Sequence, residues 1–180
     1  MLYKYKDIFA ILKSDYNIKK EIKKGTLFKF NNGLYGDKQH YSKIEEIVTL
    51  FPNAILDGYT ALFYLGISSI DSEIIYVSSK VNSTRIHDPH VKQIFKDKNT
   101  IFEGVILQVI NGCEVKIYDR EKMLIHVIKN RNKIKAGIYK DIVNSYRKIS
   151  NELNKIKLAN YLEHEVNKKH IYEILNREFL

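Results

Sequence analysis

The sequence predicts an α+β protein: a small basic unit at the N-terminus, a larger α/β domain, and helices at the C-terminal end. Residues 16–36 have the pattern of a short basic helix followed by a hairpin. The sequence has two Asn-Gly pairs, at residues 32–33 and 111–112. Segments rich in β-branched and apolar residues flank the later pair, which indicates a sheet. From Ile138 onward, apolar residues recur at helical spacing. We therefore expect an N-terminal winged helix-turn-helix over residues 1–38. A domain over residues 41–180 with a small mixed or antiparallel sheet should follow.

Composition favours an anionic partner. The chain has 180 residues, 44% of them hydrophobic, and a formal net charge of +9. Such a balance suits nucleic acid, an acidic protein or a membrane surface. No apolar run approaches the ~20 residues that cross a bilayer, and Asp7 interrupts the first apolar stretch, so neither a membrane span nor a signal peptide is expected. Cys113 is the only cysteine, which excludes an internal disulfide and a thiolate zinc cluster. We expect a cytoplasmic protein.

Residues 16–36 are the stretch that carries the functional prediction. Ile18 and Ile22 are four residues apart and share one helical face, while lysines cover the rest of the surface. Ser14 or Asp15 can cap the start of this helix through a side-chain oxygen. Gly25 stands where the helix ends, because glycine adopts the left-handed cap conformation without strain. Asn32-Gly33 between apolar runs predicts a tight hairpin. In a winged helix-turn-helix, the helix enters the major groove of DNA and the hairpin, or wing, rests on the backbone.

The expected DNA contacts follow from this layout. The N-terminal end of the helix usually meets the groove, so its first residues are the base readers. The helix lysines would contact phosphates or base edges, and polar residues of the wing would contact phosphates. The predicted DNA-binding residues are Tyr16, Asn17, Lys19, Lys20, Lys23, Lys29, Asn31 and Asn32. The alternative is that this lysine-rich face is only solvated surface.

The N-terminal unit is small for a winged helix. A first helix is predicted over residues 4–13, with Ile8, Phe9, Ile11 and Leu12 facing inward. Residues 1–38 contain nine lysines against Asp7, Asp15, Glu21 and Asp37, a net charge of +5. A unit of this length rarely buries enough apolar surface to be stable alone. Either its first helix is truncated or it leans on the next unit.

The middle of the chain alternates helix and strand signals. Polar residues 37–40 form a linker, and Pro52 ends a helix over residues 41–50 that begins near Ser42. Asp57 is expected to cap a helix that closes at Gly66. The other expected elements are strands over residues 74–79, 101–110 and 113–118 and a helix over 121–130 that Asp119 caps. His126 would be a partly buried core residue of that helix.

Residues 81–99 show no regular pattern. His87-Asp88-Pro89-His90 is the best metal candidate, because two imidazoles and a carboxylate can bind a metal. No third histidine or cysteine stands at a recognisable interval, so a solvated loop is favoured.

The remainder of the chain is predicted to be helical to the end. The inward stripe comprises Ile138, Ile142, Tyr146, Ile149, Leu153 and Ile156, followed by Leu158, Leu162 and Val166. Residues 129–157 carry nine basic side chains against Asp141 and Glu152, a net charge of +7. This second basic zone would suit DNA, RNA or an acidic protein.

Catalytic signatures are missing from the sequence. It has no phosphate-binding Gly-x-x-x-x-Gly-Lys-Ser/Thr loop, no Gly-x-Gly-x-x-Gly turn and no Gly-x-Ser-x-Gly nucleophile turn. Cys113 beside a turn is more readily a small core residue than a nucleophile. A nuclease would require carboxylates such as Glu73, Glu103 and Glu114 to meet in space. We expect no enzyme, no catalytic residue, no metal and no cofactor.

Three stretches resemble one known family. They are IKKGTLFKFNNGLYG at residues 22–36, FPNAILDGYTALFYLGIS at 51–68 and KIYDREKMLIHVIKNR at 116–131. The first stretch resembles the recognition helix and wing of the family. The second resembles a segment with a Phe-Pro pair, a short apolar run, and then a helix that contains an Ala-Leu pair and closes at a glycine. The third resembles a segment in which a strand is followed by a helix. In this order they resemble the AbiEi family, the antitoxins of type IV abortive-infection systems and their winged-helix regulator relatives. The likeness extends from about residue 4 to residue 155.

The resemblance implies a specific function. The N-terminal unit would bind inverted repeats in the promoter of its own operon and repress transcription, with two copies expected on a palindrome. The C-terminal domain would oppose a nucleotidyltransferase-type toxin in a phage-defence system, without a stable complex. Two alternatives remain open: a protein-interaction module with a vestigial winged helix, and a metal-dependent nuclease.

Overall fold

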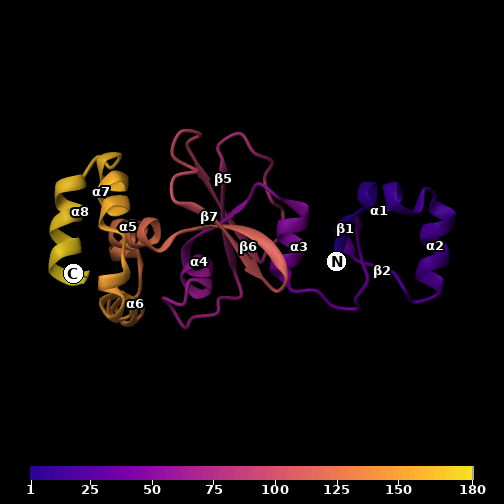
Figure 1. The fold of residues 1–180 in the computed structure, drawn as a ribbon, viewed down its shortest axis with the longest axis horizontal. Coiled ribbons are helices and arrows are strands. Elements are labelled where there is room, and N and C mark those ends of the chain that lie inside the picture. The colour runs from indigo at the N-terminus through magenta and orange to yellow at the C-terminus, as the bar shows by residue number, and fades with distance from the viewer. Residues whose placement is uncertain (180) are drawn as a thin grey trace. The chain divides into compact units, whose positions relative to one another are not determined.

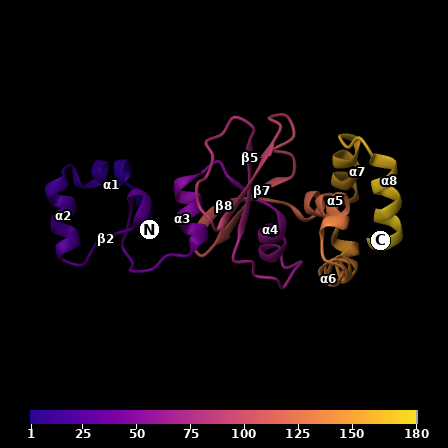
Figure 2. The ribbon, with the colours of Figure 1, turned by 180° about the vertical axis from the view of Figure 1, so that it is seen from behind.

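The structure, a computed structural model, describes residues 1–179 and forms two compact units (Figures 1 and 2). The first unit comprises residues 1–53 together with residues 111–113, and the second comprises the other described residues. The expected boundary at residues 38–41 stays a prediction. The described chain has the expected α+β class: N-terminal helices with a three-stranded sheet, then a five-stranded sheet, then C-terminal helices.

The N-terminal unit packs two helices on a small antiparallel sheet. Its elements are β1 (Leu2–Lys4), α1 (Tyr5–Leu12), α2 (Asp15–Lys23), β2 (Phe28–Lys29), β3 (Leu34–Gly36) and α3 (Lys43–Leu50). The strand order is β1-β3-β2, with Tyr35 of β3 opposite Tyr3 on one side and Lys29 on the other. Ile8, Ile18, Leu27 and Tyr35 form the buried core between the helices and the sheet.

The helix α1 differs from expectation in its inward face. Ile8 is buried and Leu12, four residues later, packs against the core, but Phe9 and Ile11 are exposed, so the prediction that they face inward was wrong. One helical face can meet the core, and Ile8 and Leu12 occupy it. The strand β1, which the sequence did not predict, lies beside β3.

Local capping defines both ends of α2 as expected. At its start, the Ser14 hydroxyl accepts the Asn17 backbone N–H at 3.2 Å. At its end, Gly25 has φ +72°, and its N–H donates to the Ile22 carbonyl at 3.1 Å. The Thr26 N–H reaches the Glu21 carbonyl at 3.2 Å. This pair of bonds is a Schellman motif, which requires the left-handed conformation at Gly25.

The predicted hairpin connects β2 to β3. The Phe30 N–H donates to the Leu34 carbonyl at 2.9 Å, which closes a loop of residues 31–33. Asn32 has φ +59° and Gly33 has φ +70°, the backbone conformation that Asn-Gly pairs favour in hairpins. The residues expected to form the wing therefore lie at the tip of an ordered turn.

The second unit is built on a mixed five-stranded sheet. Its strands are β4 (Ile55–Leu56), β5 (Ile75–Lys80), β6 (Val91–Lys96), β7 (Val105–Ile110) and β8 (Cys113–Tyr118), in the order β6-β5-β4-β8-β7. β4 is antiparallel to β5 and parallel to β8, and β5 is parallel to β6. β6 lies within residues 81–99, where the sequence shows no regular pattern. Residues 101–104, expected as strand, instead form a turn before β7.

Helices complete this unit. They are α4 (Gly58–Tyr64), α5 (Arg120–Asn130), α6 (Ala136–Lys148), α7 (Lys155–Glu163) and α8 (Lys168–Ile174), followed by a π-helical turn (Leu175–Phe179). α5 lies between the sheet and the pair α7 and α8 (Figures 1 and 2), and most of its side chains are buried. Asp57 and Asp119 cap α4 and α5 as predicted.

The C-terminal helical pattern was predicted with two errors. Ile142, Tyr146 and Leu153 are buried as expected, but Ile156 and Val166 are exposed, Val166 at 98%. Ile156 stands in the first turn of α7 and Val166 in the connection before α8, outside the faces that pack. Among residues 1–179, no helix is both long enough and apolar enough to span a membrane.

Candidate nucleic-acid interface

The exposed face of α2 carries the predicted helix contacts. Tyr16, Lys19, Lys20 and Lys23 follow the spacing i, i+3, i+4 and i+7, which places them on one side of a helix. All four are exposed, whereas Ile18 on the opposite side is buried in the core. The apolar contacts of Ile18 thus orient α2 so that its basic face meets solvent.

The ammonium groups of this face are available to a ligand. Within residues 1–179, the side chains of Lys19, Lys20 and Lys23 form no salt bridge and no hydrogen bond. Lys24 differs, because its Nζ lies 2.7 Å from the Glu21 carboxylate. The hydrogen bond from Lys24 and that from Thr26 lower the pKa of Glu21. The helix therefore offers three unpaired cations beside one that is already neutralised.

The hairpin contributes a second set of exposed groups. Lys29 is on β2, and Asn31 and Asn32 are at the tip of the loop; all three side chains are exposed. Lys29 has no ion pair within the described residues. The backbone of the loop is held by its turn, so these groups are presented on a defined scaffold.

The two residues predicted to read bases, Tyr16 and Asn17, differ in whether their side chains are already hydrogen-bonded. Tyr16 is exposed, and no described residue bonds its hydroxyl. The Asn17 side chain donates one amide proton to the Leu12 carbonyl at 2.8 Å, which leaves its oxygen and second proton for another partner. This bond anchors Asn17 against the end of α1.

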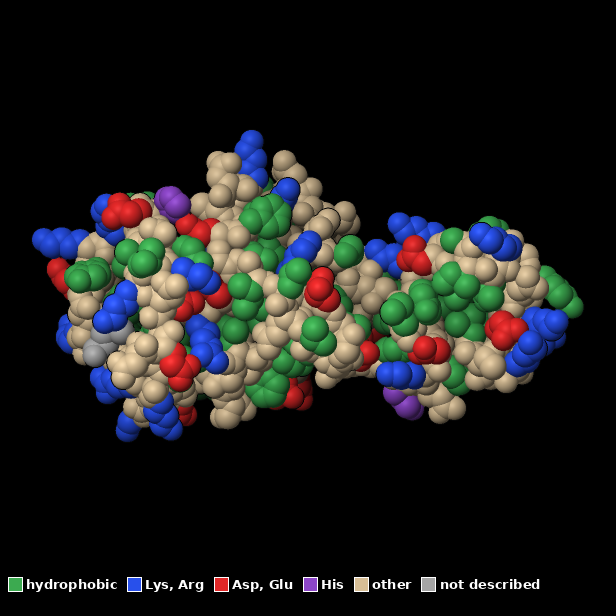
Figure 3. All heavy atoms as spheres, viewed as in Figure 1, with side chains coloured by type: hydrophobic (Ala, Val, Ile, Leu, Met, Phe, Trp, Pro, Cys, Tyr) green, Lys and Arg blue, Asp and Glu red, His purple; other side chains and the backbone are tan. Residues whose placement is uncertain are grey.

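Figure 3 shows the surface of the N-terminal unit. Lysine side chains lie at its α2 end and at other points on the unit, and hydrophobic side chains are visible nearer its middle. The exposed hydrophobic residues of this unit include Tyr5, Phe9 and Ile11. The unit therefore combines a basic end with an apolar surface.

The second unit contains a buried charged cluster that sequence reasoning did not find. The Asp57 carboxylate is 0% exposed and accepts hydrogen bonds from Ser78 Oγ at 2.5 Å and the Gly58 N–H at 2.7 Å. Lys96 Nζ lies 2.7 Å from the same carboxylate, and His126 Nδ1 lies 3.4 Å away. These partners come from β5, α4, β6 and α5.

Burial and charge act in opposite directions on this cluster. Burial alone would raise the pKa of Asp57, but the charges of His126 and Lys96 and the Ser78 hydrogen bond outweigh it, so the pKa is lowered. Burial lowers the pKa of Lys96 and of His126, and Asp57 opposes both shifts. At neutral pH Lys96 is the counter-ion of Asp57, because the lowered pKa of His126 leaves its imidazole uncharged there. The charge of His126 adds to that of Lys96 only in acid, where Asp57 itself titrates.

A cavity of about 420 Å³ lies beside this cluster. Lys96, Lys122, Lys129 and His126 contribute to its lining, as do Glu103 and Glu165. Each lysine already has a carboxylate partner: Asp57, Glu103 and Glu165, respectively. Its charges are thus neutralised internally, and the cavity does not present a surplus of positive charge.

The carboxylates of the nuclease alternative are not brought together. Glu103 contacts Lys122 and His164 in this cavity, whereas Glu73 and Glu114 are exposed elsewhere. Among residues 1–179, no three His, Cys, Asp or Glu side chains form a group suited to a metal. At the histidine loop, the Asp88 carboxylate accepts the His90 backbone N–H at 2.9 Å.

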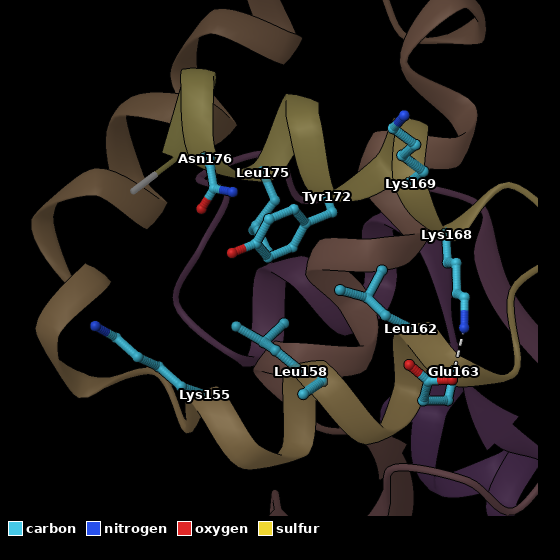
Figure 4. A pocket seen from close by; sticks show the side chains of 10 residues that line it. Lys155, Leu158, Leu162, Glu163, Lys168, Lys169, Tyr172, Leu175 and Asn176 are labelled. Carbon is cyan, nitrogen blue, oxygen red and sulfur yellow. Dashed lines mark hydrogen bonds and ion pairs between the residues drawn. The ribbon is translucent and has the colours of Figure 1, made fainter.

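A larger cavity of about 550 Å³ lies between α7 and α8 (Figure 4). Leu158, Leu162 and Leu175 form its apolar walls beside the Tyr172 ring, and Lys168 forms an ion pair with Glu163 at 2.7 Å. Among the described residues that line this cavity there is no histidine, and Glu163 is the one carboxylate.

Comparison with known proteins gives the fold and no family. No protein-family model matches the chain, and no curated protein matches it either. The fold is similar to the crystal structure of the Rv2827c protein from Mycobacterium tuberculosis, with a TM-score of 0.68 and 11% sequence identity. The match covers 98% of this chain and 71% of that chain. At this identity, the likeness establishes a shared fold across nearly the whole chain.

Proposed function

We propose that this protein is a DNA-binding antitoxin and transcriptional autorepressor of a type IV, AbiE-type toxin–antitoxin operon. In this proposal, α2 and the β2–β3 hairpin contact operator DNA upstream of the protein's own operon. The second unit opposes a nucleotidyltransferase-type toxin. The protein acts without catalysis, cofactor or metal.

One observation carries the DNA-binding part. Lys19, Lys20 and Lys23 lie unpaired on the exposed side of a helix whose other side is anchored in a core. Unpaired lysines can replace the counterions that surround DNA phosphates. The release of these counterions supplies most of the sequence-independent affinity of a protein for DNA. The order strand–helix–helix–hairpin, with β1 beside the hairpin, supports a winged helix that lacks the usual additional first helix.

The antitoxin part rests on the resemblance of residues 22–36, 51–68 and 116–131 to the AbiEi family. In the fold, the second stretch contains β4 and α4, and the third contains most of β8 and α5. These stretches supply Asp57 and His126 to the buried cluster. The toxin gene is expected beside the gene for this protein, and expression of the toxin alone should stop the growth of the host cells. Co-expression of this protein should restore that growth. Failure to restore growth would contradict the antitoxin proposal and leave the DNA-binding proposal standing.

The interaction-module alternative has its own observations. Lys133 and Lys135, in the second basic zone, are exposed. The cavity between α7 and α8 would be a second docking site in this reading. In this reading the second unit binds an acidic partner and α2 contacts nothing. DNA binding therefore discriminates between the two readings.

The test compares two double substitutions of equal charge. Lys19→Ala/Lys23→Ala removes two unpaired cations from α2, and we expect it to weaken binding to the upstream DNA by about tenfold or more. Lys133→Ala/Lys135→Ala removes the same charge from the second unit and should leave affinity within about twofold. Fluorescence anisotropy with a scrambled probe measures both affinity and sequence preference.

The outcomes separate the readings. Weak, equal binding of both probes that neither substitution changes would remove α2 as a DNA reader and favour the interaction module. Loss of binding in the Lys133→Ala/Lys135→Ala variant alone would transfer the DNA contact to the second basic zone.

A further inference from the structure

The edge strand β7 presents an unusual surface. Its sequence, Val-Ile-Leu-Gln-Val-Ile, contains no charge, no proline and no glycine. Leu107 is 59% exposed and Val109 is 71% exposed. β7 ends the strand order β6-β5-β4-β8-β7, so it has a hydrogen-bonded strand on one side. An exposed apolar edge strand is a template for pairing with another chain.

The backbone groups of Leu107 and Val109 face away from the sheet. A two-residue turn at Asn111-Gly112 joins β7 to β8, so the strands run antiparallel and Ile110 stands opposite Cys113. The Asp119 N–H donates to the Gly104 carbonyl at 2.6 Å, which continues this register. Even-numbered residues of β7 thus bond β8, and odd-numbered residues direct their N–H and C=O groups outward.

The opposite edge of the sheet, which is formed by β6, has features that discourage pairing with a second chain. β6 carries Lys92 and Lys96, and Pro89 precedes it by two residues. Charged side chains and proline near an edge discourage pairing with a second chain. β7 has neither, so the sheet has one protected edge and one open edge.

We infer that β7 is a homodimer interface, in which β7 of one copy pairs antiparallel with β7 of a second copy. The strand is self-complementary: it offers the same outward backbone groups and apolar side chains to itself, without charge repulsion. A two-fold axis at Leu107 would pair Leu107 with Leu107 of the partner subunit and Val105 with the partner's Val109. The two sheets would then continue as one, through an isologous contact.

This inference deepens the proposed function without depending on it. Two copies held at β7 would carry two α2–hairpin units, the number that an inverted repeat requires. Dimerisation is measured without DNA, so its failure leaves the DNA-binding proposal standing. Loss of DNA binding likewise leaves the dimer standing.

The experiment measures mass in solution by sedimentation equilibrium over a range of protein concentrations. The native chain should approach the mass of two copies as its concentration rises. Leu107→Lys should weaken association by about tenfold or more, because the two-fold axis sets the two lysines directly opposite each other. Val166→Lys adds the same charge at a site that is 98% exposed outside β7 and should leave association unchanged.

Charge reversal tests the register itself. Leu107→Glu alone should also be monomeric, but an equimolar mixture of Leu107→Lys and Leu107→Glu should associate, because opposite charges then meet across the axis. The mixture also shows that both variants remain folded. A native chain that is monomeric throughout, or single variants as dimeric as the native chain, would overturn the proposal. So would a mixture that fails to associate while both variants keep native circular dichroism.

Discussion

Gly25 ends α2 in a backbone conformation that other residues adopt at a cost. A Cβ atom at this position would have no heavy atom within 4 Å, so crowding does not contribute. Gly25→Ala should therefore lower the free energy of unfolding by about 1–2 kcal/mol through backbone strain alone. Gly25→Asn should lower it less, because asparagine tolerates the left-handed region. Urea unfolding of the three proteins checks the order, and equal stability of all three would contradict it.

Asp57 and Lys96 form the ion pair on which the buried cluster depends. Removing one partner leaves the other charge buried, so Asp57→Asn and Lys96→Met should each cost about 3 kcal/mol. The double variant should be less destabilised than the sum of the two, by about 1 kcal/mol or more. Unfolding by urea measures the cycle. Additive losses would mean that the two side chains act independently.

Acid should erase the contribution of Asp57. Its folded pKa is lower than the ordinary value of 3.8, so its stabilisation is complete above that pH and is lost as the pH falls through the folded pKa. The stability difference between the native chain and Asp57→Asn should thus shrink on acidification from about pH 5 to about pH 3. A constant difference over this range would show that the carboxylate is not stabilised by its neighbours.

At the scale of elements, the parts predicted from sequence were those specified by local chemistry. Ser14, Asp57 and Asp119 cap helices through bonds within a few residues, and the Asn-Gly pairs form turns through their own backbone preferences. Such signals do not depend on the remainder of the fold. The helix α2 and its hairpin were accordingly predictable, together with the exposure of all eight proposed DNA contacts.

The elements that were missed depend on distant partners. β6 is stabilised by its pairing with β5, and Gln93 donates to Ser79 Oγ at 2.6 Å, fourteen residues away. The orientation of Phe9 depends on which face of α1 meets the core. The Asp57 cluster joins residues from four separate elements, and no spacing in the sequence relates them. The sequence around Asp57 indicates a helix cap, but it does not indicate that the same carboxylate is buried and paired with Lys96.

At the scale of the whole molecule, the two units divide the proposed work. The first presents cations on a small scaffold, and the second carries the open β7 edge and the buried cluster. The DNA-binding proposal rests on α2, and the dimer proposal rests on β7. A substitution at one of these surfaces should leave the function of the other unchanged. Leu107→Lys should therefore reduce the cooperativity of binding to an inverted repeat while leaving affinity for a single half-site within about twofold. Titration of one-site and two-site probes measures this difference, and equal loss on both probes would contradict it.

The most direct test of the central claim is the salt dependence of operator binding. If Lys19, Lys20, Lys23 and Lys29 each neutralise one phosphate per copy, log affinity for a half-site should fall with log salt at a slope near about −3.6. Lys19→Ala/Lys20→Ala/Lys23→Ala should reduce the slope to about −0.9, because three contacts are removed. A native slope shallower than about −2, or one that the triple substitution does not change, would contradict α2 as the DNA-contacting surface.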